Sequence, residues 1–452
     1  MTAPTRVDVG AIIDNSRLGA FQIGIFVLCF LCLAMDGFDV QSLGYVAPAL
    51  SEELGISRVQ LGPVLSAAPF GVLFGSILCS MLADKIGRRP VLIGSTVFFA
   101  VLTYLTARAE SLNELLIIRV IAGLGMGAIM PNAVALCGEY SPKNIRVTIM
   151  MIVGNGFTAG AALGGFVAAW LLPLFGWRSV FYFGAVVPMV IAVVMLFMLP
   201  ESLQFLAVQK KKAQALAKWL RKVAPAAPVG PDVEYVVASE GRSRGVPFVA
   251  LFHDGRALGT TLLWIVNFMN LLNIYFLQGW LTTVITDSGV EESTAAMIAA
   301  MVQVGGTVGA FTLGWFVHKL GFVRVLGTCG LLACVNIALI GQPWMTVAAL
   351  FVVVFIAGLC VIGGQAAINA LAATYYPTDL RSTGVGAGLG VGRLGAIVGP
   401  SLASAFIAQG WTAADLFYAA AVPPLVLATA MFVWNRMVRP EGAGAKVEAV
   451  AH

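Results

Sequence analysis

Long runs of apolar residues, separated by short polar segments, recur along the whole chain. An α-helix needs about 20 apolar residues to cross a bilayer. The predicted spans are 20–43, 61–83, 91–107, 112–138, 147–172, 178–199, 258–285, 293–317, 323–341, 344–372, 383–408 and 413–435. This pattern predicts an all-α polytopic membrane protein with twelve transmembrane helices.

Composition supports the same class of protein. Of 452 residues, only 11% are charged, whereas a soluble domain usually carries about 25%. All seven cysteines lie in or at the ends of predicted spans. The Cys29–Cys32 pair has no second pair to complete a metal site. We therefore expect neither a disulfide framework nor a metal or other cofactor.

Basic residues indicate how the chain is oriented. With the N-terminus in the cytoplasm, nearly all Lys and Arg residues lie on the cytoplasmic side, as the positive-inside rule requires. The exceptions are Arg58, Arg108 and Arg178 outside, and Arg119 and Arg393 within spans. We expect a bacterial inner (plasma) membrane protein with both termini cytoplasmic. The basic stretch at 210–222 is expected to face anionic lipid of the bilayer, not nucleic acid.

The two halves of the chain repeat one another. GSILCSMLADKIGRRPVLIG (75–94) aligns with GAFTLGWFVHKLGFVRVLG (309–327), and AGLGMGAIMPNAVALCGEYSPKNIR (122–146) with AGLCVIGGQAAINALAATYYPTDLR (357–381). Parallel repeats are typical of alternating-access transporters, whose substrate binds between the halves near the midplane. The predicted domains are an N-terminal six-helix bundle (1–199), a cytoplasmic linker loop (200–257) and a C-terminal six-helix bundle with a short cytoplasmic tail (258–452).

The same segments resemble signatures of the major facilitator superfamily. GSILCSMLADKIGRRP is similar to its motif Gly-x-x-x-Asp-Arg/Lys-x-Gly-Arg-Arg/Lys between helices 2 and 3. DGFDVQ (36–41) and RVIAGLGMGAIMPNAVAL (119–136) resemble, more narrowly, the aromatic acid:proton symporters, which include the 4-hydroxybenzoate/protocatechuate transporters. The resemblance covers nearly the whole chain and implies the major facilitator fold. The second-half copy of the loop motif departs from it, with His318 in place of Asp.

Charges at the cytoplasmic helix ends are candidates for gating. Asp84, beside Arg88 and Arg89, can pair with charges or helix ends of the opposite half, and such contacts form in one state and break in the other. The alternative is that these charges are solvated and only set topology. The candidate gating residues are Asp84, Gly87, Arg88, Arg89, Glu139, Arg146, Asp379 and Arg381. His318 could titrate near neutral pH, but we expect it to lie at the membrane interface with no other role.

Two carboxylates interrupt the first predicted span, Asp36 and Asp39 in AMDGFDVQ (34–41). Residues i and i+3 share a helix face, and ionisable residues in spans usually mark functional sites. Asp39 and Arg119 both lie roughly 10 Å below the outer surface at 1.5 Å per residue. The resemblance implies that helices 1, 4, 7 and 10 line a central cavity, where Arg119 can meet the acids. With Arg393, near the midplane, the four charges sum to zero, and a purely structural role for them stays open.

The expected mechanism is an exchange of partners at Arg119. A guanidinium binds a carboxylate through two parallel hydrogen bonds, and in the empty protein an Asp occupies that position. Protonation of the Asp releases Arg119 for the carboxylate of the substrate, and proton and anion together keep the site neutral. We assign Asp36 and Asp39 to proton coupling, with Asp39 also able to contact substrate. Arg119 is the first candidate to bind the substrate anion, and Arg393 the second.

Amide side chains in the spans are candidates for binding the rest of the substrate. Asn267, Asn270 and Asn273 recur every three residues in the seventh span, and Tyr275 follows them. Gln365 and Asn369 share a face of the tenth span. Such amides either face a cavity or hydrogen-bond between helices.

Together these features predict a proton-coupled symporter that imports aromatic carboxylates by alternating access, without covalent chemistry. We expect a monomer, and no enzyme. Another organic acid stays open as substrate, as does proton-coupled export of drugs or metabolites. GFTAGAALGG (156–165) has the glycines of an antiporter motif but Ala161 where that motif has Pro, which disfavours export.

Overall fold

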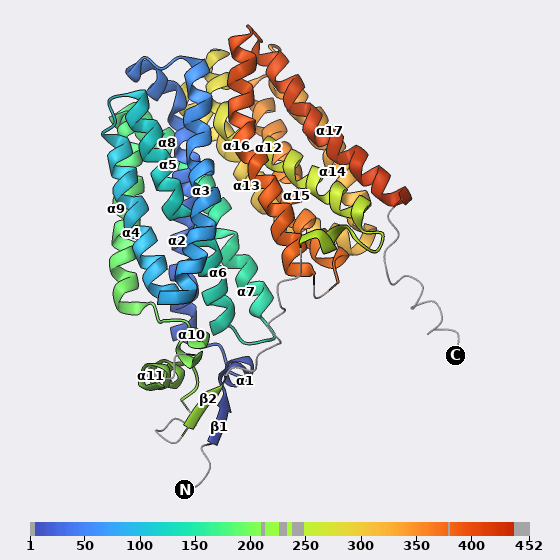
Figure 1. Cartoon of the computed structure of the whole chain (residues 1–452). Helices are drawn as coiled ribbons and strands as arrows, with labels where there is room; N and C mark the ends of the chain where they lie inside the picture. The colour runs from blue at the N-terminus through green and yellow to red at the C-terminus, as the bar shows by residue number, and fades with distance from the viewer. Residues whose placement is uncertain (1–4, 209–212, 226–232, 237–247, 378–379, 438–452) are drawn as a thin grey trace. The chain divides into compact units, whose positions relative to one another are not determined.

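A computed structural model describes residues 5–208, 213–225, 233–236, 248–377 and 380–437 (Figure 1). Within these ranges, twelve helical segments are long and apolar enough to cross a membrane. This confirms the twelve predicted spans. Most helix ends lie within a few residues of the prediction, because the loss of apolar character marks where each helix leaves the membrane.

The first six spans come from helices α2 to α10. The fourth span, Leu112–Tyr140, contains α5 and α6, and the fifth, Arg146–Phe175, contains α7 and α8. The bounds are β1 Thr5–Asp8, α1 Val9–Asp14, α2 Ala20–Leu54, α3 Arg58–Ile86, α4 Arg88–Ala107, α5 Leu112–Met126, α6 Ile129–Tyr140, α7 Arg146–Gly154, α8 Gly156–Phe175, α9 Trp177–Met198 and α10 Leu203–Val208.

Six unbroken helices form the remaining spans. The bounds after α10 are α11 Ala213–Val223, β2 Val233–Val236, the 3₁₀ helix η2 Phe248–Phe252, α12 Ala257–Asp287, α13 Glu292–Leu320, α14 Phe322–Ile340, α15 Val347–Tyr375, α16 Arg381–Ala408 and α17 Ala413–Met437.

The contacts between residues that are close in space divide the chain into two compact units. The first consists of 1–40, 70–161 and 178–242, and the second of 41–69, 162–177 and 243–452. The second unit thus combines the last six spans with the ends of α2, α3 and α8. The domain limits at 199 and 257 stay a prediction.

The first span is longer than its hydropathy predicts, since α2 continues from 43 to Leu54. Gly44 and Pro48 lower the hydropathy and the helix propensity of this segment, because glycine favours other backbone conformations and a proline inside a helix removes a backbone hydrogen bond. Burial holds this part of α2 helical, because Tyr45 and Leu50 are fully buried in the second unit. The Gln41 side chain also donates a hydrogen bond to the Gln278 carbonyl at 2.9 Å.

The segment predicted as a linker loop contains regular structure, namely α10, α11, β2 and η2. Strands β1 and β2 pair in parallel and lie side by side in Figure 1. In α11, Leu216 and Leu220 are buried, and Trp219 stacks on Phe21 of α2 with ring centroids 5.8 Å apart. This spacing of apolar residues every three or four positions explains the helix.

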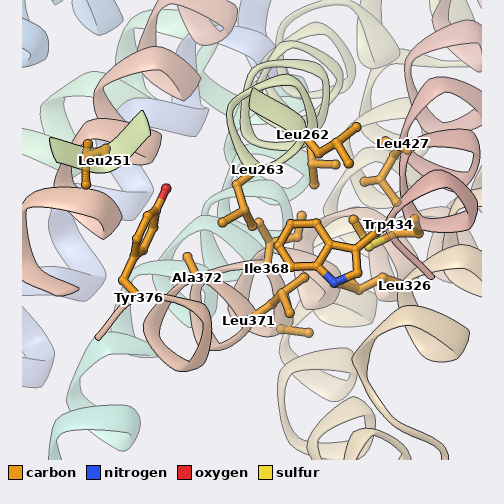
Figure 2. Packing of buried hydrophobic residues seen from close by; sticks show 14 of the residues in the cluster. Leu251, Leu262, Leu263, Leu326, Ile368, Leu371, Ala372, Tyr376, Leu427 and Trp434 are labelled. Atoms are coloured by element: carbon orange, nitrogen blue, oxygen red, sulfur yellow. The ribbon is translucent and has the colours of Figure 1, made fainter. Parts of the chain in front are cut away.

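A hydrophobic core joins helices of the second unit near η2 (Figure 2). Leu263 of α12, Ile368 of α15 and Trp434 of α17 pack together with Leu326 of α14. The core therefore ties together helices that are distant in sequence.

The buried position of Ile368 leads to a prediction about stability. We expect Ile368→Ala to lower the free energy of unfolding by about 2–5 kcal/mol, because it leaves a cavity in this core. Val352 lies on the same helix but is 58% exposed, so Val352→Ala is the matched control and should change stability by less than about 0.5 kcal/mol. Thermal unfolding in detergent measures both. Equal effects of the two variants would contradict the assignment of this core.

Candidate functional site

Asp39 and Arg119 form a buried ion pair in the first unit. The Arg119 Nη1–Asp39 Oδ2 distance is 2.9 Å, and the two side chains are 1% and 0% exposed. Arg119 Nη2 also donates to the backbone carbonyl of Asp39 at 3.4 Å. Residue 39 lies in the middle of α2, and Arg119 lies two turns into α5, which begins after the N-cap Ser111. The structure therefore brings together the two residues that the sequence predicted to meet.

Thr103 of α4 completes the surroundings of the Asp39 carboxylate. Its hydroxyl donates to Asp39 Oδ1 at 2.6 Å, and the residue is 1% exposed. Each carboxylate oxygen thus has one donor, Thr103 on Oδ1 and Arg119 on Oδ2. This arrangement satisfies an ionised carboxylate, which only accepts hydrogen bonds.

Asp36 lies one turn before Asp39 and is also buried. Among the described residues, its Oδ1 has no hydrogen-bond partner. Gly37, between the two acids, packs against α8 so closely that a Cβ there would lie 1.9 Å from the Phe157 carbonyl oxygen. The two acids therefore differ in environment, because one is held by an arginine and a threonine while the other has an oxygen without a donor.

An amide cluster occupies the second unit, and Gln365 of α15 is its centre. Gln365 Oε1 accepts from Asn270 Nδ2 at 2.8 Å. Its Nε2 donates to Asn267 Oδ1 and to Asn369 Oδ1, both at 3.1 Å. The cluster of Asn267, Asn270, Gln365 and Asn369 thus joins α12 to α15, and Gln365 and Asn369 stay half-buried.

Three other predicted binding residues lie in the second unit outside this amide cluster. Asn273 donates instead to the Ala420 carbonyl of α17, which is an interhelical hydrogen bond. Arg393 of α16 and Tyr275 of α12 are both half-buried.

The loop motif between α3 and α4 is held by Glu201, a residue that the sequence analysis did not single out. Glu201 Oε1 accepts from the backbone N–H groups of Arg88 and Arg89 at 2.9 and 3.1 Å. These are N–H groups of the first turn of α4, which have no partner within the helix. Gly87 adopts a φ of 104°, and a Cβ there would lie 2.3 Å from Glu201 Oε2. Glycine is therefore required at this position.

Arg88 pairs with Glu139 within the first unit, with 3.1 Å between Arg88 Nη2 and Glu139 Oε1. Ser202 donates to the other oxygen of Glu139 at 2.5 Å, and the Tyr140 hydroxyl donates to the Glu201 carbonyl at 2.7 Å. This network joins the ends of α4 and α6 to the segment after α9.

The remaining gating candidates are placed differently. Asp84 and Arg381 are exposed, and Arg146 forms an ion pair with Asp14 of α1. Asp379 lies outside the described residues. The role of all these charges in switching between states stays a prediction.

Two residues were missed by the sequence analysis, Thr103 and Glu201. Three threonines of α4, at 96, 103 and 106, are a weak signal, because threonine in a span usually bonds its own helix. Glu201 lies two residues after the end of the sixth predicted span, at 199, where an acid is usually an ordinary surface charge. Within the described residues, no group of three or more His, Cys, Asp and Glu side chains is arranged to hold a metal ion.

The sequence also matches a protein-family model. The model of the Major Facilitator Superfamily matches residues 29–257 and 263–451. These two ranges include nearly the whole chain.

Curated relatives match over similar lengths. The 4-hydroxybenzoate transporter PcaK of Pseudomonas aeruginosa is 38% identical over 444 residues, which cover 98% of this chain and 99% of that protein. The gallate transporter of Pseudomonas putida is 37% identical over 425 residues, or 94% of each. The 3-(3-hydroxy-phenyl)propionate transporter of Escherichia coli is 33% identical over 411 residues, or 90% of this chain and 92% of that protein.

Solved structures share the fold at lower identity. A D-xylose-proton symporter has a TM-score of 0.73 at 16% identity, and the match covers 94% of this chain and 99% of that one. The xylose transporter XylE from E. coli, in an inward-open conformation, has a TM-score of 0.72 at 15% identity, covering 95% and 99%.

The buried ion pair predicts how the protein responds to loss of one charge. Asp39→Leu leaves Arg119 buried without its partner, so we expect a loss of about 3–5 kcal/mol of stability. The double variant Asp39→Leu/Arg119→Leu should recover most of this loss, because no uncompensated charge remains. Thermal unfolding in detergent measures both.

The exposed pair Arg58–Asp287, 2.6 Å apart, provides the matched control. Asp287→Leu should cost less than about 1 kcal/mol, because water screens a surface pair. If Asp39→Leu were as stable as Asp287→Leu, the conclusion that Asp39 and Arg119 are both charged and buried would be wrong.

Proposed function

The chain belongs to the major facilitator superfamily, and on that basis we propose that it is a proton-coupled symporter that imports aromatic carboxylates by alternating access. The observation that carries this proposal is the buried ion pair of Asp39 and Arg119. In this pair a carboxylate of the protein binds the guanidinium group to which the carboxylate of a substrate would bind.

The relatives indicate the class of substrate. Their names specify 4-hydroxybenzoate, gallate and 3-(3-hydroxyphenyl)propionate. These compounds share an aromatic ring, a carboxylate and at least one ring hydroxyl. We therefore infer a hydroxylated aromatic acid as the substrate of this chain.

The carboxylate of that substrate is proposed to replace Asp39 at Arg119. Arginine is suited to this exchange, because its planar fork donates two parallel hydrogen bonds to any carboxylate. The exchange costs least when Asp39 takes up a proton, since an ionised Asp39 without Arg119 would be an uncompensated buried charge. Substrate and proton are therefore loaded together. Arg393 is the second candidate for the substrate carboxylate.

Asp36 provides a second place for a proton. Its buried Oδ1 lacks a hydrogen-bond donor, so an ionised Asp36 has little local compensation. We propose that protons reach Asp39 by way of Asp36, one helical turn away.

The amide cluster of the second unit is proposed to bind polar ring substituents. Gln365 and Asn369 are half-buried, and amides both donate and accept, as a phenolic hydroxyl does. Buried polar groups that bind a hydroxyl discriminate strongly against analogues without it. Tyr275 is a further candidate for contact with the substrate, whereas the bond of Asn273 to α17 favours a structural role.

Proteoliposome uptake tests the proposed coupling. With the outside acidic and the inside alkaline, we expect radiolabelled 4-hydroxybenzoate to accumulate above its external concentration. Asp39→Asn should reduce accumulation to the level of protein-free liposomes, because an amide cannot take up the proton. Asp287→Asn, which changes an acid of the exposed pair, is the matched control and should accumulate normally.

Other outcomes of that experiment would reject the proposal. Equal uptake with and without the gradient would indicate a facilitator. Uptake driven only by the opposite gradient would indicate proton-coupled export. Transport of aliphatic acids alone would overturn the aromatic substrate class.

Orientation in the membrane is testable separately. We propose that both termini lie in the cytoplasm of a bacterial inner membrane, because most Lys and Arg residues then lie inside. A C-terminal green fluorescent protein fusion should fluoresce, whereas a C-terminal alkaline phosphatase fusion should be inactive. Active phosphatase at that position would reverse the proposed orientation.

A further inference from the structure

Thr103 uses its hydroxyl differently from the two other threonines of the same helix. Thr96 and Thr106 donate to carbonyls four residues earlier in α4, Leu92 at 2.8 Å and Leu102 at 2.9 Å. Thr103 donates across to Asp39 of α2 instead. All three residues are buried, so exposure does not explain the difference.

A hydroxyl suits both protonation states of Asp39. It is one donor and also an acceptor. When Asp39 is ionised, Thr103 donates to it, as in the structure. When Asp39 is protonated, its O–H must donate, and Thr103 Oγ1 can accept that bond.

We propose that Thr103 is the positioning residue that holds Asp39 in both states of the transport cycle, by donating to its carboxylate and accepting from its acid form. This inference rests on the proposed function, in which substrate displaces Asp39 from Arg119. In the substrate-loaded state Asp39 no longer has Arg119, and Thr103 is its remaining hydrogen-bond partner among those the structure gives.

Of the two side chains that hydrogen-bond the Asp39 carboxylate in the structure, Arg119 does not offer this exchange. Arg119 of α5 only donates. Asp36 of α2 is the other acid that interacts with Asp39. Helix α8, which packs on Gly37, has no titratable residue, and α9 contacts this part of α2 through Phe183 against Phe38, with ring centroids 5.3 Å apart.

Loss of the hydroxyl should therefore weaken the loaded state more than the empty one. Thr103→Val keeps the shape and removes the hydroxyl. In the empty state Asp39 Oδ1 loses its donor but Oδ2 keeps the ion pair with Arg119. In the loaded state the acid proton loses its acceptor and Arg119 is no longer a partner, and an unmade buried hydrogen bond is costly. We expect the KM for 4-hydroxybenzoate at neutral pH to rise roughly tenfold, with little change in maximal rate.

Acid should compensate for this loss by mass action. The pH at which uptake is half-maximal should move about one unit lower in Thr103→Val, because each unit supplies tenfold more protons. Thr103→Ser restores the hydroxyl and should stay within about twofold of the unmodified protein. Thr106→Val, a buried threonine one turn away, is the control for loss of a hydroxyl from α4.

The test is uptake of radiolabelled 4-hydroxybenzoate into proteoliposomes at several pH values, for these variants side by side. If Thr103→Val behaves like Thr106→Val in KM and in pH profile, or if its profile moves to higher pH, the inference is wrong. If Thr103→Val does not insert stably, Thr103→Ala, which removes the same hydroxyl, is used in the experiment in its place. Failure of the unmodified protein to accumulate substrate would instead reject the proposed function, and this inference with it.

Discussion

The pairing of Asp39 with Arg119 is the interaction on which the first unit depends. Each charge alone would be expensive in a membrane interior, and within the described residues the two form an ion pair at 2.9 Å. This requirement fixes the rotation of α2 against α5, because both side chains must point at one another. The bond from Thr103 extends the requirement to α4. Three helices are thus held around one neutral charge pair.

The two units differ in the kind of polarity that they carry. The first unit holds three of the four charges predicted within spans, Asp36, Asp39 and Arg119, whereas the second holds Arg393 and the uncharged amide cluster. Amides can exchange hydrogen bonds without a change in net charge. A buried ion pair cannot open without a proton or an anion to replace one partner. We therefore propose that coupling resides in the first unit.

The loop motif has a structural role that is separate from any role in switching. Glu201 accepts hydrogen bonds from the N-terminal turn of α4, and Arg88 pairs with Glu139. Both contacts lie within the first unit and join helix ends that are distant in sequence. Gly87 is necessary for this arrangement, because its positive φ and the nearby Glu201 exclude a side chain.

The sequence by itself determined the twelve spans, the internal repeat and the position of the charged residues in the spans. These properties depend on local hydropathy and on the 3.6-residue period of the helix, which a single chain displays directly. It also placed Asp36 and Asp39 on one face. Tertiary structure alone decided that Thr103 bonds Asp39 instead of its own helix, that Glu201 caps α4, that Asn273 bonds α17, and that α2 continues to Leu54. The physical reason is that such partners depend on how helices rotate and cross, and that packing can stabilise a helix where hydropathy and propensity decline.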